Sequence, residues 1–268
     1  MKKIFYSILI FLLILLNFST VCADDVDNEV DFEDTIEVTA SNVSELPKTN
    51  SRRYIVYDRI SKSMIIGKNE DVKSAMASTT KIMTSIVILE KADLDEMVTV
   101  SAKAGGTGGS RLGLKRGDKA SVRDLLYGLM LRSGNDAAVA LAEHVGGSVK
   151  GFAELMNEKA IELGLTNTHF VTPHGLDDAN HYTTALELAK LTDYAMDNET
   201  FAKIVGTKST TIYINNQSRQ INNTNELLGV LNGVVGVKTG FTNNAGRCLV
   251  TETKRNNMDI ITIVLGAD

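Results

Sequence analysis

Several residue types and patterns are scarce in this chain, and each scarcity argues against a class of protein. The 268 residues include two cysteines, two prolines and no tryptophan, and the formal net charge is −5 at pH 7. After residue 3 there is no long basic run, which argues against nucleic acid as a partner because phosphate binding needs clustered lysine and arginine. None of the four histidines has the His-x-x-x-His spacing of a zinc peptidase, so we expect no metal and no cofactor.

Residues 1–23 have the pattern of a signal peptide. A short basic start precedes an apolar run over residues 4–16, and Val21-Cys22-Ala23 fits a cleavage site before Asp24. A membrane helix needs about 20 apolar residues, so the alternative, an uncleaved anchor, requires the run to extend through Val21. Export is predicted in both cases. Cleavage leaves Cys248 alone, which predicts a fold without an internal disulfide and with a buried, inert thiol.

The rest of the chain divides into an acidic spacer and one domain. Residues 24–50 carry acidic side chains in close succession and have little to bury, so they are expected to form a disordered linker. Residues 51–268 have the periodic patterns of folded structure and contain no internal repeat. We therefore expect a single folded domain over residues 51–268.

Short β-rich runs lie at both ends of this domain, and helical patterns lie between them. Strands are expected at residues 54–57, 64–66, 233–239, 247–253 and 258–265. Helices are expected from about residue 78, over residues 121–131, 137–146 and 148–163, and after the capping box Thr184-x-x-Glu187. The glycine-rich stretch 105–109 lacks the ending of a phosphate loop and is expected to be a surface turn. The order predicts an α/β fold of the α+β kind, with one antiparallel sheet built from both chain ends around a helical cluster.

Ser78 and Lys81 form the first of three motifs that point to nucleophilic catalysis. One helical turn separates them, so their side chains share a face. Serine is a weak nucleophile until a base removes its proton, and Lys81 can be that base only when neutral, a state favoured by burial and by a second cation nearby. The start of the helix also offers N–H groups to a developing oxyanion. Taken alone, the tetrapeptide Ser78-Thr79-Thr80-Lys81 is better explained by a capping serine and a surface lysine.

The second and third motifs are Ser133-Gly134-Asn135 and Lys238-Thr239-Gly240. The second lies in a break between predicted helices, where a serine can pass a proton to a leaving amine and an asparagine can bind a substrate amide. The third ends a predicted strand. Its lysine and threonine suit the binding of a substrate carboxylate, and its glycine lets a ligand approach the backbone closely. A capping turn and a surface lysine explain each motif separately. Together and in this order, the three motifs predict acyl transfer through a covalent serine intermediate.

In these motifs and their surroundings the chain resembles the serine-type D-alanyl-D-alanine carboxypeptidases, the low-molecular-mass penicillin-binding proteins of peptidase family S11. The resemblance runs from about Arg52 to the last residue and includes the blocks 77–84, 133–138, 172–177 and 236–242. It implies a β-lactamase-like, DD-peptidase-like fold. It also implies a cell-wall hydrolase that removes the terminal D-alanine from peptidoglycan stem peptides and that β-lactams acylate, at the cell wall or the outer face of the cytoplasmic membrane.

The resemblance also implies a role for each motif residue. Ser78 attacks the carbonyl between the two terminal D-alanines, Lys81 acts as general base, and Ser133 shares the proton traffic with Lys238. The backbone N–H groups of Ser78 and Phe241 form the oxyanion hole, and Lys238 and Thr239 bind the terminal carboxylate. The substrate-binding residues are then Asn135, Lys238, Thr239, Gly240 and Phe241.

The chain departs from the family pattern at its end. It stops directly after the predicted strand 258–265, whereas chains of this kind continue into a helix that covers the sheet. We therefore expect a truncated or divided gene product in which the C-terminal covering helix is missing. All motif residues are present, so the site can still form.

Two other functions stay open at this point. A β-lactamase of the related kind deacylates with a glutamate that activates water, and Glu158 and Glu162 lie in the segment before Thr172, although in no pattern typical of that role. A catalytically impaired remnant that binds cell-wall peptide or penicillin without turnover is the other alternative. The only membrane contact expected is an uncleaved signal segment.

Overall fold

The central sheet has five antiparallel strands, and both ends of the described chain contribute to it. The computed structural model describes residues 48–268, so the predicted signal peptide and most of the predicted linker lie outside the described residues. The strand order is β2-β1-β9-β8-β7. The strands are β1 (Arg53–Asp58), β2 (Ser63–Lys68), β7 (Val234–Thr242), β8 (Gly246–Arg255) and β9 (Met258–Ala267). The prediction of one antiparallel sheet assembled from the two ends is confirmed.

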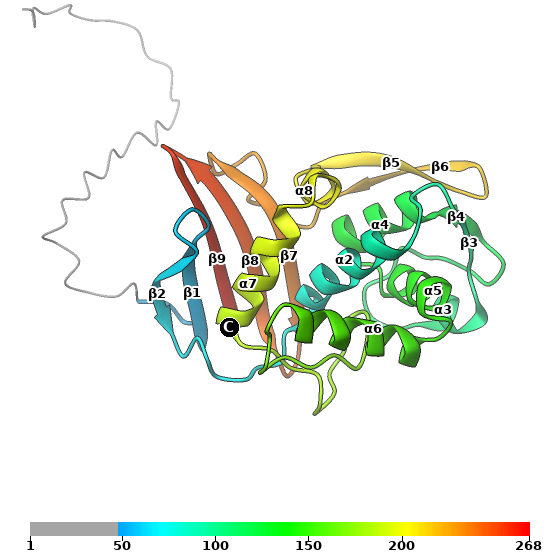
Figure 1. The fold of residues 1–268 in the computed structure, drawn as a ribbon. Helices are drawn as coiled ribbons and strands as arrows, with labels where there is room; N and C mark the ends of the chain where they lie inside the picture. The colour runs from blue at the N-terminus through cyan, green and yellow to red at the C-terminus, as the bar shows by residue number, and fades with distance from the viewer. Residues whose placement is uncertain (1–47) are drawn as a thin grey trace, which may run out of the picture. The chain divides into compact units, whose positions relative to one another are not determined.

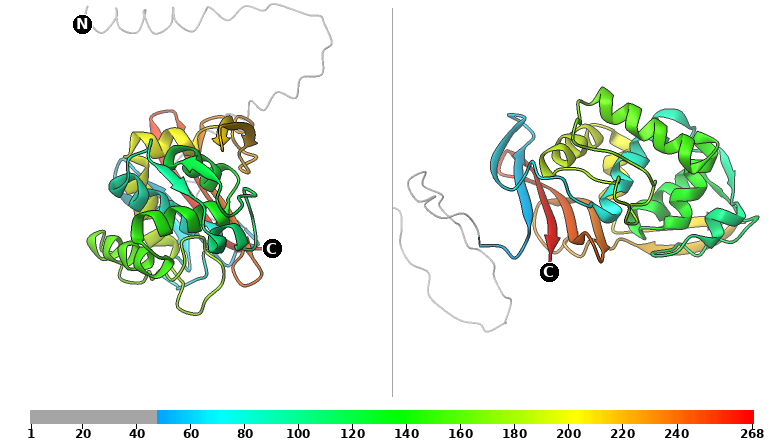
Figure 2. Two further views of the ribbon diagram at one scale, coloured as in Figure 1. Left: turned by 90° about the vertical axis from the view of Figure 1, so that its right-hand side faces the viewer. Right: turned by 90° about the horizontal axis from the view of Figure 1, so that it is seen from below.

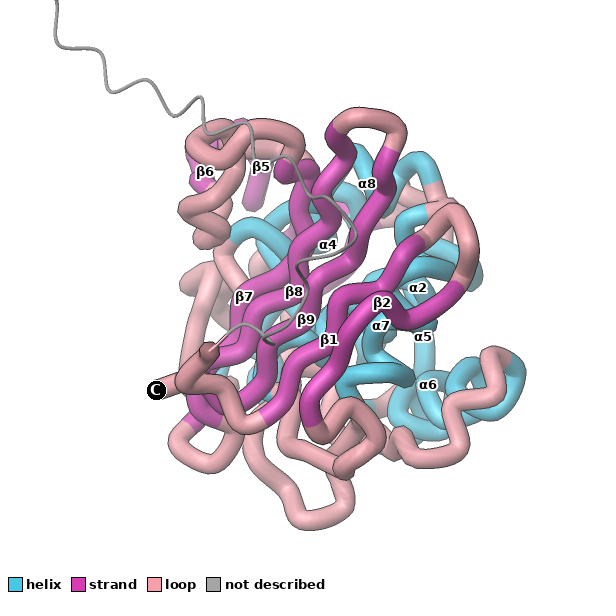
Figure 3. Tube along the Cα trace, turned by 90° about the vertical axis from the view of Figure 1, so that its left-hand side faces the viewer, coloured by secondary structure: helices cyan, strands magenta, loops and turns pink. Residues whose placement is uncertain are grey.

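The first strand is held in the sheet by the last one. Ile55 of β1 pairs with Ile263 of β9, and both side chains are fully buried. Successive residues of a strand point to opposite faces, and the helices cover the face that these isoleucines share (Figure 1). Figure 3 looks onto the other face, which no helix within residues 48–268 covers. The sheet therefore has one face buried against helices, as the alternation in its strands requires.

The helices occupy the middle of the chain and follow the predicted order (Figures 1 and 2). They are the 3₁₀ helix η1 (Ala77–Thr80), α2 (Lys81–Lys91), α3 (Ala102–Gly106), α4 (Val122–Leu131), α5 (Asn135–Gly146), α6 (Val149–Glu162), α7 (Ala185–Met196) and α8 (Glu199–Val205). Serine or threonine hydroxyls cap several of them: Ser121 caps α4, Ser148 caps α6 and Thr184 caps α7, each accepting a bond from an N–H in the first turn. Within residues 48–268, no helix is long and apolar enough to cross a membrane.

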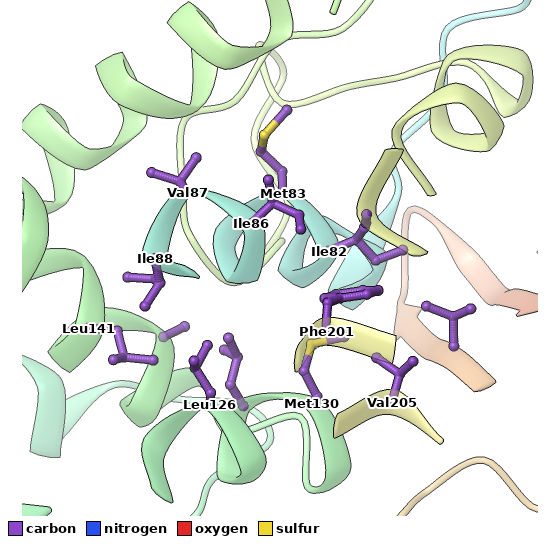
Figure 4. Packing of buried hydrophobic residues seen from close by; sticks show 14 of the residues in the cluster. Ile82, Met83, Ile86, Val87, Ile88, Leu126, Met130, Leu141, Phe201 and Val205 are labelled. Atoms are coloured by element: carbon purple, nitrogen blue, oxygen red, sulfur yellow. The ribbon is translucent and has the colours of Figure 1, made fainter. Parts of the chain in front are cut away.

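Helix α2 forms the centre of the hydrophobic core. Ile82, Met83 and Ile86 are buried, and so are Val87 and Ile88 after them on α2. Figure 4 shows their side chains among residues of α4, α5 and α8: Leu126, Met130, Leu141, Phe201 and Val205. A helix that is apolar on most sides needs such an all-round cover. Because its first residue is Lys81, the same packing holds that lysine in a fixed, dry position.

Two short hairpins were not expected from the sequence. They are β3 (Met97–Thr99) with β4 (Lys119–Ser121), and β5 (Ser209–Ile214) with β6 (Gln217–Asn222). Asn215 and Asn216 join β5 to β6 with positive φ angles of 53° and 61°. Two adjacent asparagines, which tolerate this conformation, are a local signal for a tight hairpin turn. The glycine-rich stretch also differs from the expected surface turn, since its first two glycines end α3.

Candidate active site

The nucleophile predicted from the sequence lies in a tight turn rather than in the first turn of an α-helix. Ser78 belongs to η1, and α2 begins only at Lys81. The hydroxyls of Thr79 and Thr80 donate to the carbonyls of Met76 and Ala77, at 2.6 and 2.8 Å, and fix the turn. In a 3₁₀ turn, residues three apart lie one above the other. This geometry sets the side chain of Lys81 directly against that of Ser78.

The Lys81 side-chain amine is fully buried and has three oxygen neighbours. Its Nζ lies 3.0 Å from Ser78 Oγ, 2.7 Å from Asn135 Oδ1 and 2.9 Å from the His174 carbonyl. Burial is the main cause that holds the pKa of Lys81 well below its ordinary value, and the nearby charge of Lys238 lowers it further. The negative charge of Asp136 raises this pKa and so partly opposes them. A neutral amine has two N–H bonds and one lone pair. With both N–H groups directed at Asn135 and His174, the lone pair faces the Ser78 hydroxyl.

Asn135 begins α5 and holds Lys81 in place. Its Oδ1 accepts from Lys81, and its Nδ2 donates to the Gly108 carbonyl at 2.8 Å. One amide hydrogen and one lone pair are left for a ligand, so the predicted contact with substrate is possible beside this positioning role. Ser133, two residues before Asn135, lies at the break between α4 and α5 and has a left-handed backbone conformation with φ of 57°.

Asp136 is a site residue that the sequence analysis did not single out. It is fully buried, and its carboxylate accepts hydrogen bonds from the backbone N–H groups of Leu112, Gly113 and Leu114 at 2.7–2.9 Å. These bonds clamp residues 112–114 onto the start of α5. The neighbouring Ser110 carbonyl accepts the N–H of Asn135 at 2.8 Å. The clamp therefore fixes the segment against which Asn135 rests.

Two histidines form the back wall of the site. His181 accepts the N–H of Val171 at Nδ1, which leaves the proton on Nε2, 2.8 Å from the Thr80 hydroxyl. Burial lowers the pKa of His181 to about 4 and that of His174 to about 3. Both rings are therefore neutral at pH 7: the His181 ring bonds the turn at Thr80, and the His174 ring accepts the N–H of Leu176 at 3.2 Å. Within residues 48–268, no group of three or more His, Cys, Asp or Glu side chains is arranged to hold a metal ion.

The opposite wall of the site is the edge strand β7. Lys238 is 1% exposed, its Nζ donates to the Thr239 carbonyl at 2.8 Å, and burial lowers its pKa to about 7. A Cβ added to Gly240 would lie 2.9 Å from the backbone nitrogen of Ser78. Only glycine lets the strand approach the nucleophile this closely, so the third motif is explained by steric necessity as well as by charge.

A cavity of about 620 Å³ opens between β7 and the turn that carries Ser78. Five residues predicted for the site line it: Ser78, Ser133, Thr239, Gly240 and Phe241. Lys81, Asn135 and Lys238 lie behind these, in the wall. The cavity is also lined by residues that the sequence analysis did not predict, among them Arg132, Thr224, Glu226 and Arg247. The Thr224 hydroxyl lies 2.9 Å from that of Thr239. The fold thus brings all eight predicted residues to one place.

Comparison with known proteins agrees with this arrangement. Residues 39–268 match the peptidase S11 family, described as D-alanyl-D-alanine carboxypeptidase. The chain is 37% identical over 219 residues to D-alanyl-D-alanine carboxypeptidase DacF of Bacillus subtilis, with 80% of this chain and 56% of that one covered. It is 40% identical over 252 residues to D-alanyl-D-alanine carboxypeptidase DacC of Escherichia coli, with coverages of 85% and 59%. The chain thus spans 56–59% of the length of these curated relatives.

Solved structures give the same answer at the level of the fold. The crystal structure of the Streptomyces K15 DD-transpeptidase superposes with a TM-score of 0.79 at 35% sequence identity, covering 83% of this chain and 92% of that one. That of the D-alanyl-D-alanine carboxypeptidase DacD from Francisella tularensis gives a TM-score of 0.76 at 32% identity, with coverages of 82% and 66%. The chain belongs to the peptidase S11 family, and the predicted DD-peptidase-like fold is confirmed.

Proposed function

We propose that this chain is a serine DD-carboxypeptidase that removes the terminal D-alanine from peptidoglycan stem peptides and that β-lactams acylate at Ser78. One observation carries the proposal. A fully buried Lys81 with a lowered pKa lies 3.0 Å from Ser78 Oγ and has no carboxylate within ion-pairing distance in the described chain. A base held neutral against a serine hydroxyl is what nucleophilic attack on an amide requires.

In the acylation step, Lys81 accepts the Ser78 proton as Oγ attacks the carbonyl carbon of the scissile bond. The negative charge that develops on the carbonyl oxygen needs two N–H donors. The backbone N–H of Ser78 faces β7 beside Gly240. Along an antiparallel strand the N–H and C=O of one residue point to the same side and alternate, so Phe241 N–H lies on the same edge as the Thr239 carbonyl, which accepts from Lys238. We assign these two N–H groups to the oxyanion hole.

The proton must then reach the leaving amine of D-alanine. Ser133 lines the cavity with Ser78, and no hydrogen bond in residues 48–268 joins its hydroxyl to Lys81 or Lys238. We assign Ser133 a proton-transfer role that begins when the substrate amide lies between it and Ser78. Lys238 contributes positive charge from behind the strand, and Thr239 offers its hydroxyl to the substrate carboxylate.

Release of the shortened peptide requires an acceptor for the acyl group. Water gives carboxypeptidase activity and an amine gives transpeptidation. The second activity is the other candidate, because the Streptomyces K15 structure is that of a DD-transpeptidase. The glutamates considered for a β-lactamase lie elsewhere: Glu162 pairs with Lys159 at 2.7 Å, and Glu158 lines a separate pocket beside them. This placement gives no support to a β-lactamase. We place the reaction outside the cytoplasmic membrane, where peptidoglycan is found.

The test is covalent labelling with a fluorescent penicillin, resolved on a denaturing gel, beside release of D-alanine from a peptide that ends in D-Ala-D-Ala. We expect a labelled band and D-alanine release, both lost in Ser78→Ala. A folded wild-type chain that binds the peptide without labelling or turnover would favour the impaired remnant instead. Adding a D-amino acid as acceptor separates hydrolysis from transpeptidation, because only the latter forms an exchanged peptide.

A further inference from the structure

We propose that the domain carries a second binding surface, a basic rim beside the active-site cavity, which binds a linear phosphodiester polymer of the cell envelope. The inference goes beyond the proposed function and takes from it only the location, outside the cytoplasmic membrane. No long basic run marks this surface in the sequence, because the fold assembles it. The basic rim consists of exposed lysines and arginines: Lys103, Arg111, Lys115, Arg116, Lys119 and Arg219.

The first contacts that build the rim join α3 to the loop before β4. Lys103 lies on α3, and a Cβ added to Gly105 of the same helix would lie 3.0 Å from the backbone nitrogen of Arg116. The guanidinium of Arg111 donates to the Gly105 carbonyl. Lys115 and Arg116 therefore lie beside α3, although twelve and thirteen residues separate them from Lys103.

A second set of contacts joins the β5–β6 hairpin to the same loop. The Arg219 guanidinium donates to the Leu112 carbonyl, and the N–H of Asn215 donates to the Lys119 carbonyl at 2.8 Å. Figures 1 and 2 show α3 and the two hairpins, β3–β4 and β5–β6, at one end of the domain. The rim extends to the active-site cavity, because Ser110 of the same loop lines that cavity.

Little negative charge offsets these cations. Residues 101–119 contain five lysines and arginines and one acid, Asp118, and the β5–β6 hairpin contains no acid. The Asp118 carboxylate accepts the Lys115 N–H and the Asn215 side-chain amide at 2.8 Å each. Among the described residues, no carboxylate lies within ion-pairing distance of a rim side chain. A cluster of unpaired cations attracts anions to the surface that carries it.

The backbone between these cations is open to a ligand. Residues 101–119 contain six glycines. At Gly106 and Gly108 an added Cβ would meet nothing within 4 Å, and neither residue has the positive φ that favours glycine. The fold therefore does not require glycine at these two positions. A backbone without side chains lets an anion approach closely, and arginine and lysine beside it suit phosphate oxygens.

A phosphodiester polymer fits this surface better than a bilayer does. None of the large apolar side chains exposed on the described chain belongs to residues 101–119, and the β5–β6 hairpin contributes one, Tyr213. A site for a bilayer surface combines basic residues with a face of inserted apolar ones. Cations spread over three parts of the fold suit repeated phosphates along a chain rather than one small anion. Outside the cytoplasmic membrane such a chain is an envelope polymer rather than a nucleic acid.

The experiment measures the binding of poly(glycerol phosphate), a phosphodiester chain without lipid, to the purified full chain by titration calorimetry at several salt concentrations. The rim variant is Lys115→Gln with Arg116→Gln. The matched control is Lys190→Gln with Lys203→Gln, which removes two exposed lysines of α7 and α8. Each exposed ion pair changes an affinity by up to about fivefold, so the rim variant should bind roughly 5- to 25-fold more weakly at low salt.

The salt dependence and two further measurements complete the test. Affinity of the wild type should fall as salt rises, because phosphate binding releases counterions, and the rim variant should have a shallower dependence. The control should bind like wild type. All variants should keep the wild-type Tm and the wild-type rate of acylation by a fluorescent penicillin, because the four substituted side chains are exposed and do not line the active-site cavity.

Each outcome decides a separate point. Equal affinities of wild type and the rim variant, or an equal loss in the control, would overturn the rim. Poly-L-glutamate bound as tightly as poly(glycerol phosphate) would show that charge alone is recognised, and tighter binding to phosphatidylglycerol vesicles would identify a lipid surface; either result would overturn the polymer. A chain that is acylated but does not bind the polymer loses only this inference, whereas a chain that binds the polymer without being acylated loses only the proposed function.

Discussion

Two regions of this molecule bury cations, and they do so in opposite ways. At the far end of the sheet, Arg59 is 8% exposed and is surrounded by carboxylates. Its guanidinium contacts Asp193 at 2.9 Å, Asp197 and Glu252 at 2.5 Å, and Asp259 at 3.2 Å. In the active site, Lys81 and Lys238 are 0% and 1% exposed, and neither has a carboxylate within ion-pairing distance among residues 48–268.

The difference shows in the proton affinities. The carboxylates raise the pKa of Arg59 against the cost of its burial, whereas burial lowers the pKa of both lysines. The Arg59 cluster joins the β1–β2 turn, α7 and the β8–β9 hairpin, so it stabilises the sheet. An uncompensated buried lysine does not stabilise the fold; under the proposed function, Lys81 is retained because its neutral amine can accept the Ser78 proton. The same burial of a cation is structural in one region and, under the proposed function, catalytic in the other.

Lys81→Met tests the functional region and should give the largest effect. Loss of a general base costs roughly 10²- to 10⁴-fold in rate, so acylation by a fluorescent penicillin should fall by that factor. The free energy of unfolding should change little. The variant loses the hydrogen bonds to Asn135 and His174, but it no longer buries an amine that can carry a charge. A variant acylated within threefold of wild type would contradict Lys81 as the base.

Arg59→Met tests the structural region. Removing one partner of a buried ionic cluster costs about 3–5 kcal/mol, because it leaves buried charges uncompensated. For a domain of this size each kcal/mol lowers Tm by about 2–4 °C, so a fall of roughly 6–20 °C is expected in a thermal melt. The acylation rate of the folded fraction at low temperature should stay near wild type.

The control for Arg59 is Lys62→Met, which removes a half-exposed cation bonded to Asp193 at 2.7 Å. Exposed ion pairs contribute at most about 1 kcal/mol, so Tm should move by a few degrees at most. An equal fall in Tm for both variants would show that burial of the Arg59 cluster is not what makes it stabilising.

Asp136→Asn tests a third way to bury a charge. Asp136 is balanced by backbone N–H groups rather than by a cation in contact, including those of Leu112, Gly113 and Leu114. Hydrogen bonds to a charged acceptor are worth about 1.5–3 kcal/mol, and an amide accepts through one oxygen only. We expect a loss of about 2 kcal/mol in the free energy of unfolding, measured in urea, with slower acylation because Asn135 loses its support.

The half-buried Asp118, which accepts the Lys115 N–H and the Asn215 side-chain amide at 2.8 Å each, provides the matched control. Asp118→Asn should change the free energy of unfolding by no more than about 0.5 kcal/mol. A similar loss in both variants would contradict the clamp.

The parts of this structure that depend on local sequence were predictable, and those that depend on long-range burial were not. The capping box at Thr184 correctly opened α7, where the Thr184 hydroxyl accepts the Glu187 N–H at 3.1 Å. The Glu187 carboxylate, however, turns to the N–H of Asn167 at 2.8 Å, a contact that spacing along a helix cannot reveal. The hairpin at Asn215 had a local signal that was overlooked.

The site shows the same division. The three motifs and the family resemblance gave the residues that meet at the cavity and in the wall behind it, because spacing and residue type were enough to suggest the chemistry. The Arg59 cluster draws on residues up to 200 positions apart, and no periodic pattern links them. Asp136 looked like an ordinary residue in the first turn of a helix. Its role follows from the loop that folds back onto it, and that loop's path is set by tertiary packing.

The smallest predicted effect is on the pH dependence of the free energy of unfolding, which should differ in sign between the two regions. Burial, with a hydrogen bond to Asp259, raises the pKa of Glu252 to about 7, whereas burial lowers the pKa of His181, behind the nucleophile, to about 4. Unfolded, these groups titrate near 4.5 and 6.5. Between pH 5 and pH 6, native Glu252 keeps a proton that the unfolded chain has released, so its contribution to stability falls as pH rises. Native His181 lacks a proton that the unfolded chain still holds, so its contribution rises.

Variants separate the two contributions. Over that one pH unit each group can change the free energy of unfolding by at most about 1.4 kcal/mol. Urea melts at pH 5 and pH 6 should show wild type losing stability relative to Glu252→Gln and gaining stability relative to His181→Gln. The two differences should have opposite signs, because one region holds a proton that its carboxylates share and the other excludes one from the wall behind Ser78. Differences of the same sign would mean that charge burial is handled alike in both regions, and the contrast between a structural and a functional cation would fail.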